Sequence, residues 1–328
     1  PTIGIVGRLG GIGARPERVG LVSDADGAVS AVAIAMKLGD MVNRGDVLKG
    51  DVFVSTHICP TAPTKPHDPV PFMGSPINMT IANREEMSAD LDAVISIDTT
   101  RGNRVINHRG FAISPTIKEG WIMRTSEDLL ELMSYTTGKA PVVFPITMQD
   151  ITPYGNGLYH LNSVLQPCTA TKAPVVGIAL TAETMVPGCG TGSSQPADIE
   201  SAVRYAIEVA KAFGEGKCSF YNEEEYRLCV ERYGEMKQLQ GMGALPAADA
   251  DAGVADDQPQ GAALGDHVEA GRDLALQGEL DGVGQNVQQD LVQPQRVGDD
   301  VLVLHVHGVD EKRQPLCRNI GLDDGAHT

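Results

Sequence analysis

The fold is decided by a stretch in which a strand, a glycine-rich loop and a helix follow one another: IGIVGRLGGIGARPERVGLVSDADGAVSAVAIAMKLGDM, residues 3–41. The continuous apolar run 3–6 predicts a strand covered on both faces. A strand with one face exposed to solvent would instead alternate apolar and polar residues. Small and apolar residues throughout 28–41 predict a buried helix. The next apolar run, 52–55, predicts a second strand, so the chain opens with a β–loop–α–β unit.

The same alternation continues to about residue 240. Apolar, β-branched runs predict strands at 93–97, 142–146 and 175–180, and amphipathic stretches predict helices at 126–137, 198–213 and 222–239. Ser126 and Gly138 have the residue types of an N-cap and a C-cap around the first of these helices. Strands alternating with helices predict the α/β class, a three-layer α/β/α sandwich with a mixed, mostly parallel sheet.

The composition changes near residue 244. No aromatic residue occurs after Tyr233, and sixteen acidic and five basic residues follow residue 244, so this tail carries −11 of the chain's net charge of −17. We therefore expect a folded domain over 1–243 and a tail over 244–328 that is disordered or non-native. Residues 301–304 could form a strand, but the tail offers it no partner core.

Charge and hydrophobicity exclude several functions. The mildly acidic body argues against nucleic-acid binding, and no apolar run approaches the roughly 20 residues of a membrane span. Six cysteines without a C-x-x-C pair fit a reducing compartment, so we expect a cytoplasmic protein that binds a small molecule. A homo-oligomer is compatible with the sequence. The start at Pro1, directly before a strand, suggests an N-terminal truncation.

Polar residues follow the predicted strands, and ligands of open α/β sheets bind at the carboxyl ends of strands. Asp24 and Asp26 precede the first helix, where they are oxygen ligands for a metal, general bases, or helix-capping residues. Thr56, His57 and Cys59 end the second strand. His57 is a candidate base or metal ligand. The alternative is a purely structural role, with a buried Cys59 thiol beside a strand-end histidine.

Other loops add candidates. Asp98 ends the third strand, and the candidates for substrate binding are His108, Arg109, Asp150, Asn156 and His160. The glycine-rich loop 7–16 resembles a dinucleotide-binding turn, but no helix opens directly after it, so a tight turn is the favoured interpretation. The glycine-rich segment 187–194 could receive a carboxylate or oxyanion.

Several stretches resemble a bacterial family known only as domain of unknown function 1177, over roughly residues 1–241. They include THICP (56–60), PHDPVPFMGSP (66–76), SIDTTRGN (96–103) and MQDITPYGNGLYHLNS (148–163). The family name implies no activity.

The order of segments also distantly resembles the zinc-dependent aminopeptidase and deacylase superfamily. That resemblance implies the bridging metal ligand at Asp24, a strand-end ligand at Asp98 and a substrate loop at 155–157. Arg8 and Gly10 stand where the superfamily has His-x-Asp, Cys59 and Pro60 stand where it has Glu-Glu, and the last histidine ligand is missing. The cofactor is thus unknown; we expect no standard two-zinc site, although one divalent metal could be held by Asp24 and Asp98.

Together these residues predict a hydrolase of small amide, peptide or carboxylate substrates. His57 and Asp26 are the predicted catalytic residues, with Asp24 and Asp98 orienting His57 or binding a metal. The predicted substrate-binding residues are Arg8, Thr56, His108, Arg109, Asp150, Asn156 and His160. The alternative is a non-catalytic small-molecule-binding protein derived from the same fold by loss of metal ligands.

Overall fold

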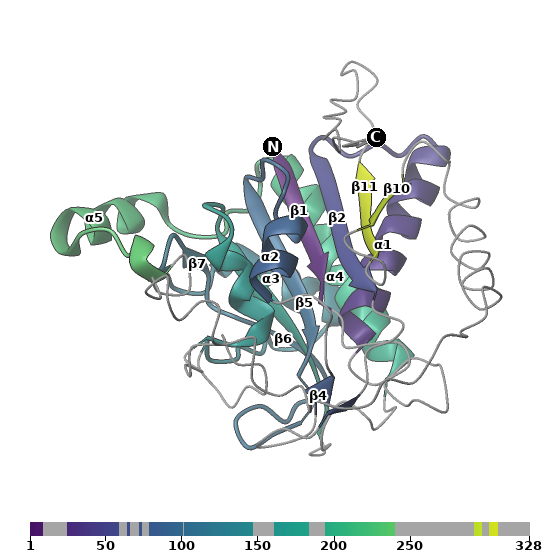
Figure 1. Cartoon of the computed structure of the whole chain (residues 1–328), viewed down its shortest axis with the longest axis horizontal. Helices are drawn as coiled ribbons and strands as arrows, with labels where there is room; N and C mark the ends of the chain where they lie inside the picture. Colours follow the sequence, from purple (N-terminus) through teal and green to yellow (C-terminus); the bar gives the residue numbers. More distant parts are fainter. Residues whose placement is uncertain are drawn as a thin grey trace, which may run out of the picture.

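The computed structural model describes residues 1–8, 25–58, 64–65, 72–73, 79–100, 102–146, 161–183, 194–239, 292–296 and 302–307. Its centre is a mixed sheet with four parallel strands side by side (Figure 1). In spatial order these strands are β2 (Asp51–Ile58), β1 (Thr2–Gly7), β5 (Ala93–Thr99) and β9 (Val175–Thr181). The carboxyl ends of all four therefore meet at one edge of the sheet.

Shorter strands extend the sheet in antiparallel orientation on both sides. Beside β9 lie β6 (Gly110–Ile113) and β7 (Ile117–Lys118), and β7 also pairs with β8 (Trp121–Ile122). Beside β2 lies β11 (Leu302–His307), which pairs in turn with β10 (Val292–Arg296). A separate small hairpin joins β3 (Thr64–Lys65) and β4 (Phe72–Met73).

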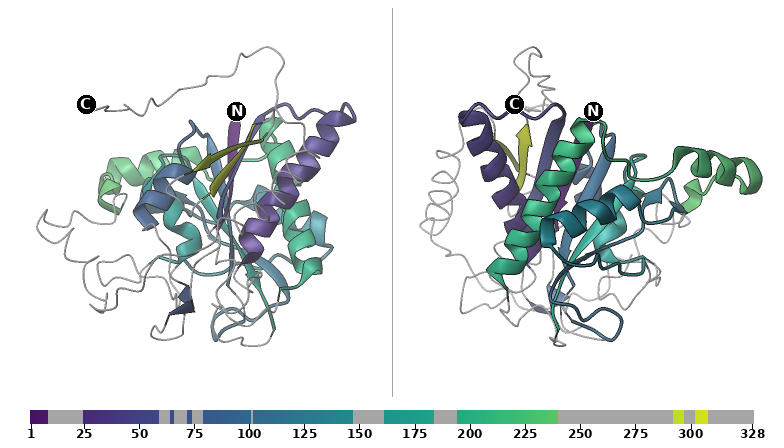
Figure 2. Two further views of the ribbon diagram at one scale, coloured as in Figure 1. Left: turned by 45° about the vertical axis from the view of Figure 1, so that its right-hand side comes forward. Right: turned by 180° about the vertical axis from the view of Figure 1, so that it is seen from behind.

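Helices cover both faces of the sheet. The short helix α2 (Met79–Glu86) and the 3₁₀ helix η2 (Ser163–Thr169) lie on the face that Figure 1 turns to the viewer. On the opposite face lie α1 (Asp26–Asn43), α3 (Glu127–Thr137) and α4 (Pro196–Gly214), which stand in front when the molecule is seen from behind (Figure 2). Helix α5 (Glu223–Tyr233), followed by η3 (Lys237–Leu239), projects from the body and buries no residue.

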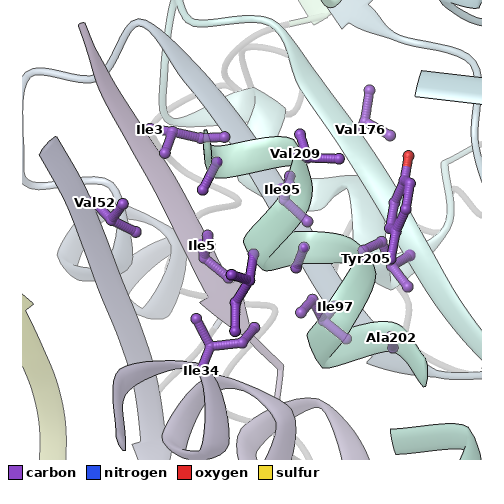
Figure 3. Close-up of a cluster of buried hydrophobic side chains, with 14 of the residues drawn as sticks. Ile3, Ile5, Ile34, Val52, Ile95, Ile97, Val176, Ala202, Tyr205 and Val209 are labelled. Atoms are coloured by element: carbon purple, nitrogen blue, oxygen red, sulfur yellow. The ribbon is translucent and has the colours of Figure 1, made fainter. Parts of the chain in front are cut away.

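Strand alternation divides the hydrophobic core in two. In β1, Ile3 and Ile5 face α1 and α4, where they pack in the cluster drawn in Figure 3, whereas Val6 joins the cluster under α2 and η2. In β2, Val52 and Val54 belong to the first cluster and Phe53 to the second. A strand buried on both faces has no polar face, which explains the continuous apolar runs in the sequence.

The structure confirms the predicted class: an α/β fold with a mixed, mostly parallel sheet flanked by helices. The predicted positions of the central strands and helices also agree with those in the structure. Ser126 caps α3 by accepting a hydrogen bond from the Leu129 amide at 3.5 Å, and Gly138 ends it with φ of 68°. Glycine tolerates this left-handed backbone conformation at no steric cost.

Three predictions about elements were wrong. Residues 142–146 form no strand; Val143 makes only an isolated parallel bridge to Ile113, because this segment contributes buried side chains rather than a full ladder. The helix predicted over 222–239 ends at Tyr233. The possible strand near 301–304 is present as β11, and the wrong part of the prediction is that it lacks partners, since it pairs with β2 as well as β10. Helix α2 was not predicted at all.

Candidate functional site

Three polar side chains stand in a row at the carboxyl edge of the sheet. In the parallel register Gly7 of β1 pairs with Thr56 of β2 and with Ile97 of β5. The next residue of each strand is therefore Arg8, His57 or Asp98. Because alternate residues of a strand face the same side of the sheet, these three side chains face α2 and η2, as Val6, Phe53 and Val94 do. Three adjacent strands thus present a cation, an imidazole and a carboxylate to the same side.

Helix α1 begins close behind this row. A Cβ atom on Gly7 would lie 2.3 Å from the carbonyl oxygen of Gly27, and one on Gly27 would lie 2.3 Å from the carbonyl oxygen of Ile97. Only glycine at both positions lets the helix start approach the strand ends so closely. Gly7 and Gly27 therefore allow close backbone contact, and Gly7 does so within strand β1. The rest of the glycine-rich loop lies outside the described residues, so the tight-turn interpretation stays a prediction.

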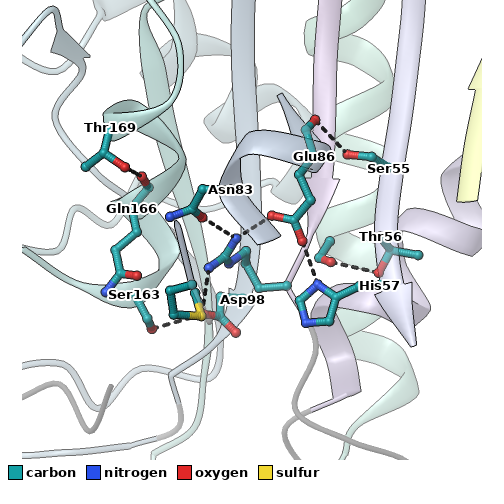
Figure 4. Close-up of polar contacts among 12 residues, drawn as sticks. Ser55, Thr56, His57, Asn83, Glu86, Asp98, Ser163, Gln166 and Thr169 are labelled. Carbon is teal, nitrogen blue, oxygen red and sulfur yellow. Dashed lines mark hydrogen bonds and ion pairs between the residues drawn. The ribbon is translucent and has the colours of Figure 1, made fainter. Parts of the chain in front are cut away.

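Helix α2 supplies one partner for both Arg8 and His57, namely Glu86, and Figure 4 shows its contact with His57. Glu86 Oε2 accepts a charge-assisted hydrogen bond from Arg8 Nη1, and Glu86 Oε1 lies 2.6 Å from His57 Nδ1. Arg8 Nη1 also donates to Asn83 Oδ1 at 2.8 Å. The side chains of Arg8, Glu86 and His57 are 3%, 0% and 10% exposed, so this charged network lies almost entirely out of water.

The charge state of Glu86 follows from opposing effects. Burial alone would raise the pKa of its carboxyl, but the Arg8 guanidinium and the hydrogen bond and charge of His57 outweigh burial and hold the pKa below its ordinary value. Glu86 is therefore an ionised carboxylate, which only accepts hydrogen bonds. It follows that Nδ1 of His57 carries the proton in this contact. The lone pair of a neutral His57 then resides on Nε2, which points away from Glu86 in Figure 4.

Asp98 and Asp26 lie beside this network with partners of their own. Asp98 Oδ1 accepts from the Thr99 amide at 2.7 Å, and Oδ2 accepts from Ser163 of η2 at 3.2 Å. Asp26, at the start of α1, is 2% exposed and accepts a hydrogen bond from the Ser194 hydroxyl. We expected Asp24 or Asp98 to orient His57, whereas the carboxylate bonded to its Nδ1 is Glu86.

The remaining predicted residues divide into two groups. Thr56 is buried and donates to the Gly7 carbonyl oxygen at 2.7 Å, so its hydroxyl fixes the strand ends. His108 and Arg109 precede β6, and Arg109, 66% exposed, lies 3.9 Å from Asp198 at the start of α4. Four predicted residues and one further candidate lie outside the described part of the chain: Asp24, Asp150, Asn156, His160 and Cys59.

Glu86 and Asn83 are the residues that the sequence analysis missed. Their segment, MTIANREE, reads as a polar surface helix. One signal could have found them: Ala82, Asn83, Glu86 and Met87 form a stripe at helical spacing, and all four are buried. A stripe that combines apolar and polar residues indicates polar groups turned toward the core. Glu86 also ends its helix, where the dipole disfavours a carboxylate, so helix stability does not explain its position.

Two absences hold for the part of the chain that the structure describes. In that part of the chain no group of three or more His, Cys, Asp or Glu side chains is arranged to hold a metal ion. Asp24, one of the two predicted ligands, lies outside it, so the one-metal hypothesis stays a prediction. No helix within the same residues has the length and apolar character needed to cross a bilayer.

The fold and the site define an α/β protein with a buried arginine–carboxylate–histidine network at the carboxyl edge of its parallel strands. The chain belongs to the family described as protein of unknown function (DUF1177), which matches residues 1–243. Comparison with curated protein sequences finds no match. The family match confirms the first resemblance and ends where the sequence composition changes.

Proposed function

We propose that this protein is an enzyme of hydrolase type, with His57 as the general base, acting on small amide, peptide or carboxylate substrates. The single observation that carries the proposal is the buried hydrogen bond between His57 Nδ1 and the ionised Glu86. A carboxylate bonded to one ring nitrogen fixes the tautomer, orients the ring and stabilises the imidazolium that forms after proton uptake. The second nitrogen is then available as a base.

The proposed reaction begins with a water molecule beside Nε2 of His57. His57 removes a proton from this water as the oxygen attacks the substrate carbonyl carbon, and Glu86 stabilises the resulting imidazolium. The protonated His57 then returns the proton to the leaving nitrogen or oxygen as the acyl bond breaks. Asp98 and Asp26 face the same edge of the sheet. Asp26 remains a predicted catalytic group, and the distant resemblance to zinc aminopeptidases leaves Asp98 as a predicted metal ligand.

Arg8 takes a positioning role in this proposal. Its Nη1 group bonds Glu86 and Asn83 at once, so the guanidinium balances the charge of Glu86 and fixes the carboxylate that holds His57. Without this cation, a fully buried carboxyl would tend to be protonated and would no longer require the proton on Nδ1. Substrate binding by Arg8, as predicted from the sequence, would compete with these bonds.

The same arginine favours the second candidate, a non-catalytic small-molecule-binding protein. Arg8 stands where the aminopeptidase resemblance implies a histidine ligand, and it already supplies the positive charge that compensates Glu86. In this candidate the strand-end row, formed by Arg8, His57 and Asp98, would bind a ligand by hydrogen bonds alone. The two candidates differ in whether His57 must exchange a proton during function.

The test replaces His57 with asparagine, whose side-chain amide can still donate to Glu86 but cannot act as a base. We expect wild-type protein to hydrolyse members of a panel of small amides, dipeptides and carboxylate esters. His57→Asn should lose at least about 100-fold in kcat, the usual contribution of a general base. Nitrogen NMR of the imidazole should show the proton on Nδ1 in the neutral ring.

The matched control is Glu85→Gln, next to Glu86 but with its side chain 25% exposed, which should retain full turnover. Turnover unaffected in His57→Asn, or a neutral ring protonated on Nε2, would reject His57 as the base. Binding of a panel member without turnover would favour the second candidate. Elemental analysis of wild type and Asp24→Ala tests the one-metal hypothesis separately, since only a bound metal should be lost in the variant.

A further inference from the structure

Three buried polar side chains lie in the layer between α2, η2 and β5, and we call them the buried polar set: Asn83, Ser96 and Gln166. They are 1%, 0% and 0% exposed. Among the described residues, no hydrogen-bond partner is present for Asn83 Nδ2, Ser96 Oγ or either carboxamide atom of Gln166. Helix η2 contacts both α2 and β5, so the three residues come from elements packed against one another.

The direction of the Asn83 amide is fixed by its neighbour. Arg8 has only donors, so the atom that faces it must be Oδ1, and Nδ2 must point away. In Figure 4 this nitrogen points to the side of the site on which Gln166 lies. Ser96 joins them from the sheet, because Ile95 and Ile97 face α1 and α4 and strand alternation turns Ser96 to the α2 side.

Unpartnered amides and hydroxyls at this depth need a physical explanation. Burying such groups without hydrogen bonds is costly, and more than about 90% of buried polar groups in proteins have a partner. The buried polar set offers a donor from Asn83, a donor and an acceptor from Gln166, and a hydroxyl from Ser96. An internal water molecule binds about three such groups.

We propose that ordered internal water, bound by Asn83, Ser96 and Gln166, joins α2 to η2 and β5. This water site has a consequence for the strand-end row. Helix α2 carries Glu86, which holds His57, and η2 carries Ser163, which holds Asp98. The bound water therefore ties the histidine side of the site to the aspartate side. The inference is independent of whether the protein is a hydrolase.

The sign of one stability change tests the site. Gln166→Met keeps the length of the side chain and removes both polar atoms. If water is bound, the variant leaves Asn83 and Ser96 without their bridging partner, and the melting temperature should fall by roughly 2–4 °C. If the layer is dry, the variant removes two unpaired polar atoms, and the melting temperature should rise.

Two further variants and a crystal structure complete the test. Gln195→Met, an exposed position just before α4, should leave the melting temperature unchanged, and Ser96→Ala should lower it in the same direction as Gln166→Met. A high-resolution crystal structure should show water within hydrogen-bond distance of Asn83 Nδ2 and Gln166. An unchanged or raised melting temperature in Gln166→Met would overturn the proposal. So would a direct Asn83–Gln166 hydrogen bond without water.

Discussion

Glu86 is the residue on which the candidate site depends. Its carboxylate has no exposed surface, yet it stays ionised because it joins Arg8 on one oxygen and His57 on the other. Removing one partner of a buried ion pair leaves the other charge uncompensated, which costs far more than the pair itself contributes. Arg8, 3% exposed, would be that uncompensated charge.

We predict that Glu86→Gln lowers the free energy of unfolding by about 3–5 kcal/mol at neutral pH. The effect depends on pH. Because the folded-state pKa of Glu86 is held below the ordinary value of 4.5, ionisation of Glu86 contributes stability that is complete above that pH. The contribution is lost as the pH falls further, through the folded-state pKa. Urea denaturation of both proteins across this range should show the difference shrinking in acid.

Glu85→Gln is the matched control on the same helix. Glu85 pairs with Arg84, whose side chain is 71% exposed, so the change should cost less than about 1 kcal/mol. An equal loss in both variants would mean that helix α2, rather than the buried ion pair, is what the substitutions damage. A Glu86→Gln difference that stays constant into acid would contradict an ionised Glu86.

At the scale of elements, the start of helix α1 and the end of strand β1 are built for contact without side chains. Gly7 and Gly27 bring the two backbones together, and the carbonyl oxygens of Arg8 and Ile97 lie where a Cβ on Gly27 would go. This contact positions Asp26 at the edge of the sheet, immediately before Gly27. A helix placed one side chain further away would move that carboxylate out of the site.

We predict that Gly27→Ala destabilises the protein by about 1–3 kcal/mol, because the added methyl group would lie 2.3 Å and 2.4 Å from two carbonyl oxygens that belong to the backbone. Without this contact, alanine in place of a helical glycine would stabilise by up to about 1 kcal/mol. The sign of the change in the free energy of unfolding, measured by urea denaturation, therefore decides whether this contact exists. A gain in stability would show that α1 does not rest on the strand ends.

At the scale of the whole molecule, the outer edge of β2 is covered by a strand from the distant end of the chain. β11 pairs with β2 along its length, in a register from Leu302 opposite Ile58 to His307 opposite Phe53. The family match ends at residue 243, before β10 and β11. The domain that the family defines would thus leave β2 as an edge strand, with unpaired backbone groups open to association.

We predict that removing residues 244–328 speeds amide exchange in β2 and promotes self-association, because the truncated chain exposes this edge. Hydrogen–deuterium exchange and light scattering measure the two effects. Amides of β1 should stay protected in both forms, since β1 lies between β2 and β5. Equal exchange in β2 with and without the tail would favour the prediction from composition, that the tail does not fold onto the domain.

The sequence by itself determined the class of the fold and the edge at which polar residues gather. Apolar runs buried on both faces require helices on both sides of the sheet, and parallel strands bring their carboxyl ends together. His57 and Asp98 could be found in this way because each lies at the end of a predicted strand, whereas Arg8 was proposed from the distant resemblance to zinc aminopeptidases. Local pattern is enough for such residues, since the strand fixes both their position and their face.

Only the tertiary structure decided which of these groups touch, and through what. Glu86 lies 29 residues from His57 and 78 from Arg8 in the sequence, on a short helix whose composition is that of a surface segment. The packing of α2 on the sheet turns its Asn83–Glu86 face inward and makes a surface-type sequence part of a buried network. Pairing between distant charges depends on this packing, and no local propensity encodes it.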